Sequence, residues 1–365
     1  MPSPAQAAPS LPTPMATSVE TDGATWATIP MGDLSQLANT FWQLLYRPAG
    51  SQTWSNQVEA TATATNGGLV LASGPGSLVV GVRPSLDLHF TPLIATFGGP
   101  SSWSDGLIAQ ALAARQSALA GTPADALALV AAPHGGSQVL ADAGNLSGWH
   151  ALLSEAPLAG TRPGEICGIG ELTSVGFAGN EPLAGASCAK PGVIGLYGLR
   201  GGEWGLVPAV LPAQLRGGQA EVLAMIQLRA TAVALVAVVL HRSTYLLTLS
   251  PNGRQGWSSS SPLALGRRQA VASSGPAGSG AVFVLVQEAS GTELLATVAA
   301  GPGSKWQYLV APPSGTETVA FVRDGTANAF VGKNTNLDIW SLSRGSSRWS
   351  KLQVMRVPIQ FGSSS

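Results

Sequence analysis

Short apolar segments, separated by clusters of glycine, proline, asparagine and serine, run through most of the chain. Towards the C-terminus four such segments follow one another, at residues 316–322, 327–333, 337–343 and 348–353. Each is rich in aliphatic, β-branched or aromatic side chains and is bounded by turn-forming residues, which is the pattern of short antiparallel strands. The pattern predicts an all-β protein whose strands are joined by tight turns.

Seven tryptophans mark a repeat in this strand pattern. Each follows small polar or glycine residues, with a mean spacing of about 49 residues, at positions 54, 103, 149, 204, 257, 306 and 349. A period of about 40–50 residues with four strand-like segments is typical of β-propeller blades. We therefore predict a seven-bladed β-propeller with four antiparallel strands per blade, with six or eight blades as the alternatives. Each tryptophan is expected to pack in the wedge between adjacent blades rather than to bind a ligand.

The two ends of the chain are expected to close the ring together. Three N-terminal segments, at 24–29, 40–47 and 52–58, provide three strands, and the C-terminal segment 356–361 provides a fourth. A blade shared in this way leaves no open sheet edge. Residues 106–120 fit the strand pattern less well, because their alanine-rich composition also suits a short helix; strand and loop is the preferred interpretation.

Composition supports one domain and an exported protein. Residues 1–20 are rich in proline, alanine and serine and are predicted to be a tether, followed by a single propeller domain over 21–365. The 45 glycines and 26 prolines fit the turns of many short strands. Charged residues make up 10% of the chain and the net charge is zero, which argues against binding to nucleic acid. No segment is long and apolar enough to predict a transmembrane helix.

The two cysteines are predicted to form a structural disulfide. Cys167 is expected to begin the inner strand of the fourth repeat and Cys188 to end the next strand, after a turn at Gly179 and Asn180. These positions face each other in an antiparallel hairpin, with two buried free thiols as the alternative. A disulfide implies an oxidising compartment, so we expect an extracytoplasmic location.

The repeat region resembles secreted bacterial β-propellers of the BNR or Asp-box type, often described as sialidase-like. The Asp box reads S-x-D-x-G-x-T-W, and the segment from Ser250 to Trp257 keeps its serine and tryptophan, with Asn252 in place of the aspartate. A second segment, from Thr21 to Trp26, keeps the Asp, Gly, Thr and Trp with a shifted aspartate. The compositional style also resembles exported propeller lipoproteins of high-GC Gram-positive bacteria. The resemblance implies a cell-envelope protein, secreted or lipid-anchored, and implies no particular activity.

Candidate enzymatic chemistry is sparse. A sialidase-like site needs an arginine cluster, a Tyr/Glu nucleophile pair and an acid, and none of the four tyrosines, Tyr46, Tyr197, Tyr245 and Tyr308, lies in such a pattern. The chain has no G-x-S-x-G sequence and no Cys/His cluster with zinc-ligand spacing. We therefore predict no catalytic residues, no cofactor and no metal.

One positional pattern of charged residues stands out in so uncharged a chain. The predicted turns between the second and third strands of successive blades carry Arg83, His134, Lys190, His241, Glu288 and Lys333. Such turns lie on one face of a propeller, so the set is a candidate ring of ligand-binding residues. The alternative is that these turns are simply solvated and collect polar residues.

These observations favour a non-enzymatic, extracytoplasmic binding or assembly platform for a protein or a cell-envelope glycan. The alternatives are a divergent sialidase-like glycosidase and a propeller lectin. A lectin that uses the repeated tryptophans predicts exposed indoles, whereas a structural role predicts buried ones.

Overall fold

The computed structural model describes most of the chain. The described residues are 17–19, 24–32, 40–56, 69–74, 77–82, 93–97, 103–105, 109–114, 125–142, 148–228, 231–253, 256–266, 268–274, 281–287, 293–299, 301–321, 325–333 and 336–356.

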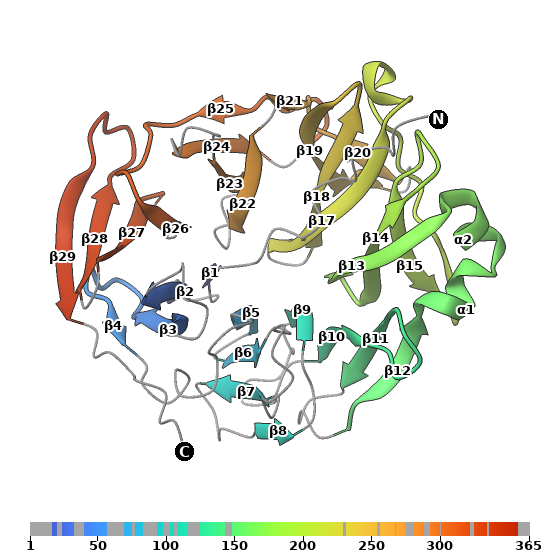
Figure 1. Ribbon diagram of the computed structural model, residues 1–365, viewed down its shortest axis with the longest axis horizontal. Helices are drawn as coiled ribbons and strands as arrows, with labels where there is room; N and C mark the ends of the chain where they lie inside the picture. The colour runs from blue at the N-terminus through green and yellow to red at the C-terminus, as the bar shows by residue number, and fades with distance from the viewer. Residues whose placement is uncertain are drawn as a thin grey trace.

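Antiparallel sheets stand around a central axis like the blades of a propeller (Figure 1). The first strand of each group lies near the centre and the last strand lies at the rim. The prediction of an all-β propeller is thus confirmed in its main features.

Each sheet is built from consecutive strands. The three N-terminal sheets are β1 Thr17–Val19, β2 Thr25–Gly32, β3 Thr40–Arg47 and β4 Ser55–Asn56; β5 Leu69–Gly74, β6 Ser77–Val82, β7 Leu93–Phe97 and β8 Trp103–Asp105; and β9 Ala109–Ala114, β10 Ala126–Ala131, β11 Ser137–Asp142 and β12 His150–Ser154. The two C-terminal sheets are β22 Gln269–Ser274, β23 Ala281–Gln287, β24 Glu293–Ala299 and β25 Gln307–Tyr308; and β26 Thr316–Phe321, β27 Ala327–Lys333, β28 Asn336–Leu342 and β29 Ser350–Arg356.

The central part of the chain forms one nine-stranded sheet. It contains β13 Ile169–Ala178, β14 Glu181–Cys188, β15 Gly195–Arg200 and β16 Glu203–Leu206, followed by β17 Gln219–Leu228, β18 Thr231–Leu240, β19 Ser243–Pro251, β20 Trp257–Ser259 and β21 Leu263–Gly266. The two groups are joined only where Ser187 of β14 pairs with Glu221 of β17.

Three short helical elements interrupt the β pattern in the described residues. Helix α1 Glu155–Ala159 and helix α2 Arg162–Cys167 lie between β12 and β13, and the 3-10 turn η3 Ala213–Leu215 lies between β16 and β17. Both α-helices were missed by the sequence analysis, although they account for the long spacing from Trp149 to Trp204. Residues 109–114 form β9, which agrees with the preferred interpretation of the alanine-rich segment, and its remaining residues 106–108 and 115–120 lie outside the described part.

The first sheet differs from the expected closure. Its innermost strand is β1, which pairs with β2 and comes from the segment predicted to be a tether. The C-terminal strand β29 belongs to the last sheet, and residues 357–361 lie outside the described part of the chain. The expectation that a C-terminal strand completes the N-terminal sheet is therefore wrong, because the chain supplies an N-terminal strand instead.

Apolar side chains fill the wedges between neighbouring sheets. Separate buried clusters join β9–β12 to β13–β16, β13–β16 to β17–β20, β17–β20 to β22–β25, β22–β25 to β26–β29, and β26–β29 to β1–β4. The sheets β13–β16, β17–β20, β22–β25 and β26–β29 are covered on both sides in this way. A strand of such a sheet reads as a nearly continuous apolar run, as in β18.

The repeat tryptophans take part in these wedges. All seven lie in or directly before the fourth strand of a group, and Trp54 and Trp257 are buried, at 1% and 8% exposure. The indole Nε1 of Trp204 donates to Leu152 O of the preceding sheet at 3.0 Å. That of Trp349 donates to Val310 O, in the connection that follows β25, at 3.3 Å. The buried Trp54 and Trp257 agree with the predicted packing role, whereas Trp149, Trp204, Trp306 and Trp349 are half-buried. The side chain of Trp103 lies outside the described part.

The last and first sheets also meet at a repeat tryptophan. Trp54 donates its indole N–H to Asn328 Oδ1 at 3.2 Å and packs edge-on against Phe330. The backbone N–H of Trp54 donates to Gln353 Oε1, and Gln353 Nε2 donates back to Trp54 O, both at 3.0 Å. The side-chain amide of Gln353 thus makes the two backbone hydrogen bonds that a neighbouring strand would make, and it links the last sheet to the first.

Replacing Gln353 by alanine should destabilise the protein. The variant loses two hydrogen bonds and leaves the backbone of Trp54 unpaired at the ring junction, so we expect the free energy of unfolding to fall by about 1–3 kcal/mol. Gln307→Ala on the exposed outer strand β25 is the matched control and should change it by less than about 0.5 kcal/mol. Equal effects in chemical denaturation would contradict closure by Gln353.

Candidate functional site

Strand order places two kinds of connection on one face of the ring. Each group has four antiparallel strands from the centre to the rim, so the chain returns to its starting face before it crosses to the next sheet. The connections between second and third strands lie on that same face. We call it the crossover face.

Four of the six predicted ring residues fall in the described part of the crossover face. His134 lies between β10 and β11, Lys190 between β14 and β15, and His241 between β18 and β19, while Lys333 ends β27. All four are exposed. Arg83 and Glu288 lie outside the described residues. The role of this set in ligand binding stays a prediction.

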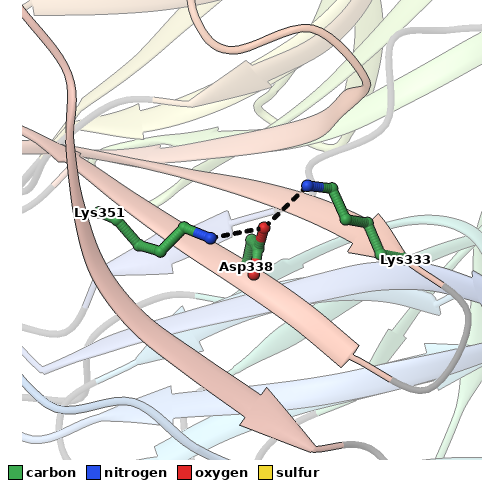
Figure 2. Close-up of polar contacts among 3 residues, drawn as sticks. All are labelled: Lys333, Asp338 and Lys351. Atoms are coloured by element: carbon green, nitrogen blue, oxygen red, sulfur yellow. Dashed lines mark hydrogen bonds and ion pairs between the residues drawn. The ribbon is translucent and has the colours of Figure 1, made fainter.

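Lys333 has a structural partner rather than a free ammonium group. Figure 2 shows Lys333 and Lys351 on either side of Asp338, each with Nζ at 3.0 Å from Asp338 Oδ2. The hydrogen bond from Lys351, followed by that from Lys333, lowers the pKa of the buried Asp338 carboxyl despite the opposing effect of burial. Lys351 also lies over the ring of Trp340, 5.2 Å from its centroid. This cluster has one more positive than negative charge.

The β18–β19 turn has an uncommon backbone. His241 and Arg242 have φ values of 49° and 67°, which are the only positive φ values of non-glycine residues in the described part of the chain. Two-residue hairpin turns of this kind favour asparagine and glycine. The turn therefore presents a histidine and an arginine at some cost in backbone energy.

A disulfide fixes the helical insert to the ring. Cys167 and Cys188 are bonded, with their Cα atoms 4.9 Å apart, which confirms the predicted pairing. The predicted position of Cys167 was wrong: it is the last residue of α2, and β13 begins at Ile169, opposite Cys188. The hairpin turn at Gly179 and Asn180 is as expected, with Gly179 at φ 61°.

Removing the disulfide should lower stability. The bond closes a loop with a separation of 21 residues, so the Cys167→Ala/Cys188→Ala variant should lose about 3 kcal/mol in unfolding free energy. Denaturation with and without a reducing agent provides the control, because the reductant should destabilise the native chain and leave the variant unchanged. A native chain that is insensitive to complete reduction would contradict this role.

Carboxyl groups cluster near the inner strands on the crossover face. Glu155, the first residue of α1, accepts hydrogen bonds at Oε2 from the backbone N of Ser137 and of Leu172, at 3.1 and 3.4 Å. Burial, followed by the charge of Glu155, raises the pKa of Glu171. Burial, followed by the charge of Glu171, raises the pKa of Glu221 to about 7.

The sequence analysis did not identify these glutamates. Glu171 and Glu221 are 50 residues apart, close to the repeat length, and each is the third residue of an inner strand that is otherwise mostly apolar. A search for carboxylates in phase with the tryptophans would have found both.

The raised pKa of Glu221 predicts a pH-dependent stability. Between about pH 4.5 and 7 the folded chain holds a proton on Glu221 that the unfolded chain has lost, so this group's contribution decreases as the pH rises through that window. Glu221→Gln should become more stable relative to the native chain as the pH rises from 4.5 to 7, by about 3 kcal/mol at most. Denaturation curves at several pH values test this, and Glu165→Gln, at an exposed position on α2, should show no such trend.

A cavity of about 290 Å³ lies between α2 and the outer strands β15 and β16. Its walls are mainly apolar or glycine, with Arg200 and Glu203 as the charged residues; the full lining is Pro163, Gly198, Arg200, Glu203, Trp204, Gly205, Leu206 and Val207. The cavity is held from both sides, because Trp204 bonds to Leu152 O and Tyr197 Oη donates to Pro163 O.

The polar groups of the cavity lie at its β15–β16 side. Arg200 Nε is 3.2 Å from Glu181 Oε2, and both side chains are largely exposed, so this ion pair contributes little to stability and leaves Arg200 accessible. Gly205 opens the cavity wall, since a Cβ there would meet no heavy atom within 4 Å. The lining thus combines apolar side chains with charged groups and exposed backbone in similar measure.

Neither a metal-ligand cluster nor a candidate membrane-spanning helix is found among the described residues. No group of three or more His, Cys, Asp or Glu among them is arranged to hold a metal ion. No helix in the described ranges is long and apolar enough to cross a membrane.

Comparisons with known proteins show similarity of fold at low sequence identity. No family model and no curated protein sequence matches the chain. The BP39L lectin from Burkholderia pseudomallei is 14% identical, with a TM-score of 0.47 over 78% of this chain and 84% of the lectin. The six-bladed fucose-binding lectin of Aleuria aurantia is 14% identical, with a TM-score of 0.47 over 82% of this chain and 95% of the lectin.

A third similar structure is larger than this chain. TolB from Acinetobacter baumannii is 9% identical, with a TM-score of 0.41 over 90% of this chain, and the matched region spans 62% of TolB. At these identities no ligand or activity carries over from the similar proteins.

Proposed function

We propose that this protein is an extracytoplasmic, non-enzymatic β-propeller that binds a glycan in the cavity between α2 and β15–β16. The cavity carries the proposal. A pyranose ring offers an apolar C–H face, which suits the indole of Trp204, and hydroxyl groups, which suit the donors of Arg200 and the acceptors of Glu203.

A binding role is favoured over glycoside hydrolysis at this cavity. Glycosidases of the common type need two carboxyl groups flanking the scissile bond. Glu203 is the one carboxylate among the residues that line the cavity, and Glu181 is paired with Arg200. The arrangement can hold a sugar but offers no acid–base pair.

Two further parts of the proposal concern architecture and location. We count seven blades, because seven tryptophans each mark the fourth strand of a group and the nine-stranded sheet contains two such groups joined by one residue pair. The buried disulfide supports an oxidising, extracytoplasmic compartment. The Asp-box resemblance is supported by the turn between β19 and β20, where Asn252 Nδ2 donates to Ser258 Oγ at 2.9 Å.

Filling the cavity should abolish glycan binding without unfolding the protein. Gly205→Leu adds a side chain where the wall is open, so we expect loss of binding to the glycan identified on a glycan array and an unfolding midpoint close to that of the native chain. Gly160→Ala, at the end of α1 and outside the cavity, is the control and should bind normally. Intrinsic tryptophan fluorescence during the titration reports Trp204.

Two results would contradict the proposal. One is native-like binding by Gly205→Leu, which would place the glycan elsewhere. The other is absence of binding to any envelope glycan by the native chain.

A further inference from the structure

The carboxyl of Glu221 is buried without a hydrogen-bond partner at Oε1. The residue is only 3% exposed. A carboxyl oxygen in this position costs free energy unless a donor reaches it, because burial has removed its water. The group therefore needs an explanation beyond the packing of the ring.

A second carboxyl lies beside it. Glu221 is opposite Ser187 where β14 meets β17, and Ser187 Oγ accepts the backbone N–H of Glu171 at 3.0 Å. The charge of Glu171 acts on Glu221, as the raised pKa of the latter reflects. The backbones of the exposed Glu171 and the buried Glu221 thus both lie beside Ser187, at the crossover ends of two inner strands.

The surroundings leave this pair uncompensated. The neighbouring strands β18 and β22 carry no titratable residue. The described titratable groups at the crossover ends of the elements around Glu221 are Glu155 on α1, Glu171 on β13, Lys190 after β14, Arg216 before β17, His241 and Arg242 after β18, and Arg268 before β22. Arg268 donates to Leu265 O and Ala264 O and lies over the Tyr308 ring. Glu155 is already engaged by the backbone of Ser137 and Leu172, and no ion pair joins the cations to Glu221.

We propose that Glu171 and Glu221 form a binding site for the ammonium group of a primary amine. Such a group supplies an N–H donor for the orphan Oε1 and one positive charge between two carboxyls, both of which the site lacks. An ammonium suits the site better than a metal ion, because the described residues contain no set of three ligands in metal-binding geometry. The site shares no residue with the proposed glycan cavity, and the inference does not depend on it.

Calorimetric titration of the full chain with n-butylamine tests the proposal. We expect saturable binding at pH 8, and affinity at least about tenfold weaker at pH 5, because protons compete for the carboxyls. Tetramethylammonium carries the same charge without an N–H donor and should bind at least about tenfold more weakly than n-butylamine at pH 8.

Variants distinguish amine binding at Glu171 and Glu221 from nonspecific attraction of the amine to acidic residues. Glu221→Gln is nearly isosteric and should lose at least about tenfold in affinity, as should Glu171→Gln, whose side chain lies nearer the surface. Glu165→Gln, an exposed glutamate on α2, is the matched control and should bind like the native chain, as should Gly205→Leu.

Clear outcomes would overturn the proposal. They are absence of saturable binding at pH 8, equal binding of n-butylamine and tetramethylammonium, tighter binding of calcium than of n-butylamine, or unchanged affinity in folded Glu221→Gln and Glu171→Gln. Loss of glycan binding in Gly205→Leu with intact amine binding would separate this site from the cavity.

Discussion

The contact between the fourth strand of one sheet and the backbone of the preceding sheet, or of the connection that follows it, is the interaction on which this ring depends. Tryptophan suits it because the indole fills the wide part of the wedge and its N–H finds an acceptor across the gap, as at Trp204 and Trp349. At the junction of the first and last sheets, Trp54 donates its indole N–H to the side-chain oxygen of Asn328 instead. Gln353 adds two hydrogen bonds to the backbone of Trp54, as a neighbouring strand would.

A ring held by its wedges leaves its faces free to carry other features. The crossover from β12 to β13 holds an insert of two short helices, and the disulfide fixes the end of α2 to β14. Pro163 of this insert, together with β15 and β16, encloses the cavity. The helical insert therefore creates a cavity beside one blade, β13–β16. Blades that were strict repeats of one another would not differ in this way.

The amino-acid pattern predicted the repeated parts of the structure well and the unrepeated parts poorly. The strand pattern anticipated β26 to β29 closely, because apolar runs and turn residues fix short strands locally. The cavity was missed because it joins Pro163 of α2 to residues of β15 and β16 that are distant in sequence. Strand β1 and helices α1 and α2 make mainly local contacts, but at 3, 5 and 6 residues they are too short for a clear periodic pattern. The cysteine pair was found from its spacing, but Cys167 was misplaced because the local signals of α2 were overlooked. These signals are the Thr161 N-cap, Pro163 in the first turn and Gly168 after the last residue.

Two buried carboxyls show how differently one scaffold can treat the same group. Asp338 meets two lysines, and those contacts hold it ionised. Glu221 forms no ion pair with a described cation, and burial, followed by the charge of Glu171, raises its pKa to about 7. Nothing in the packing of β17 requires a glutamate there, since glutamine or an apolar residue would fill a similar volume at lower electrostatic cost. The buried Glu221 destabilises the fold and lies near a second glutamate, Glu171. Binding of a cationic ligand, the proposed ammonium group, accounts for a glutamate at this position.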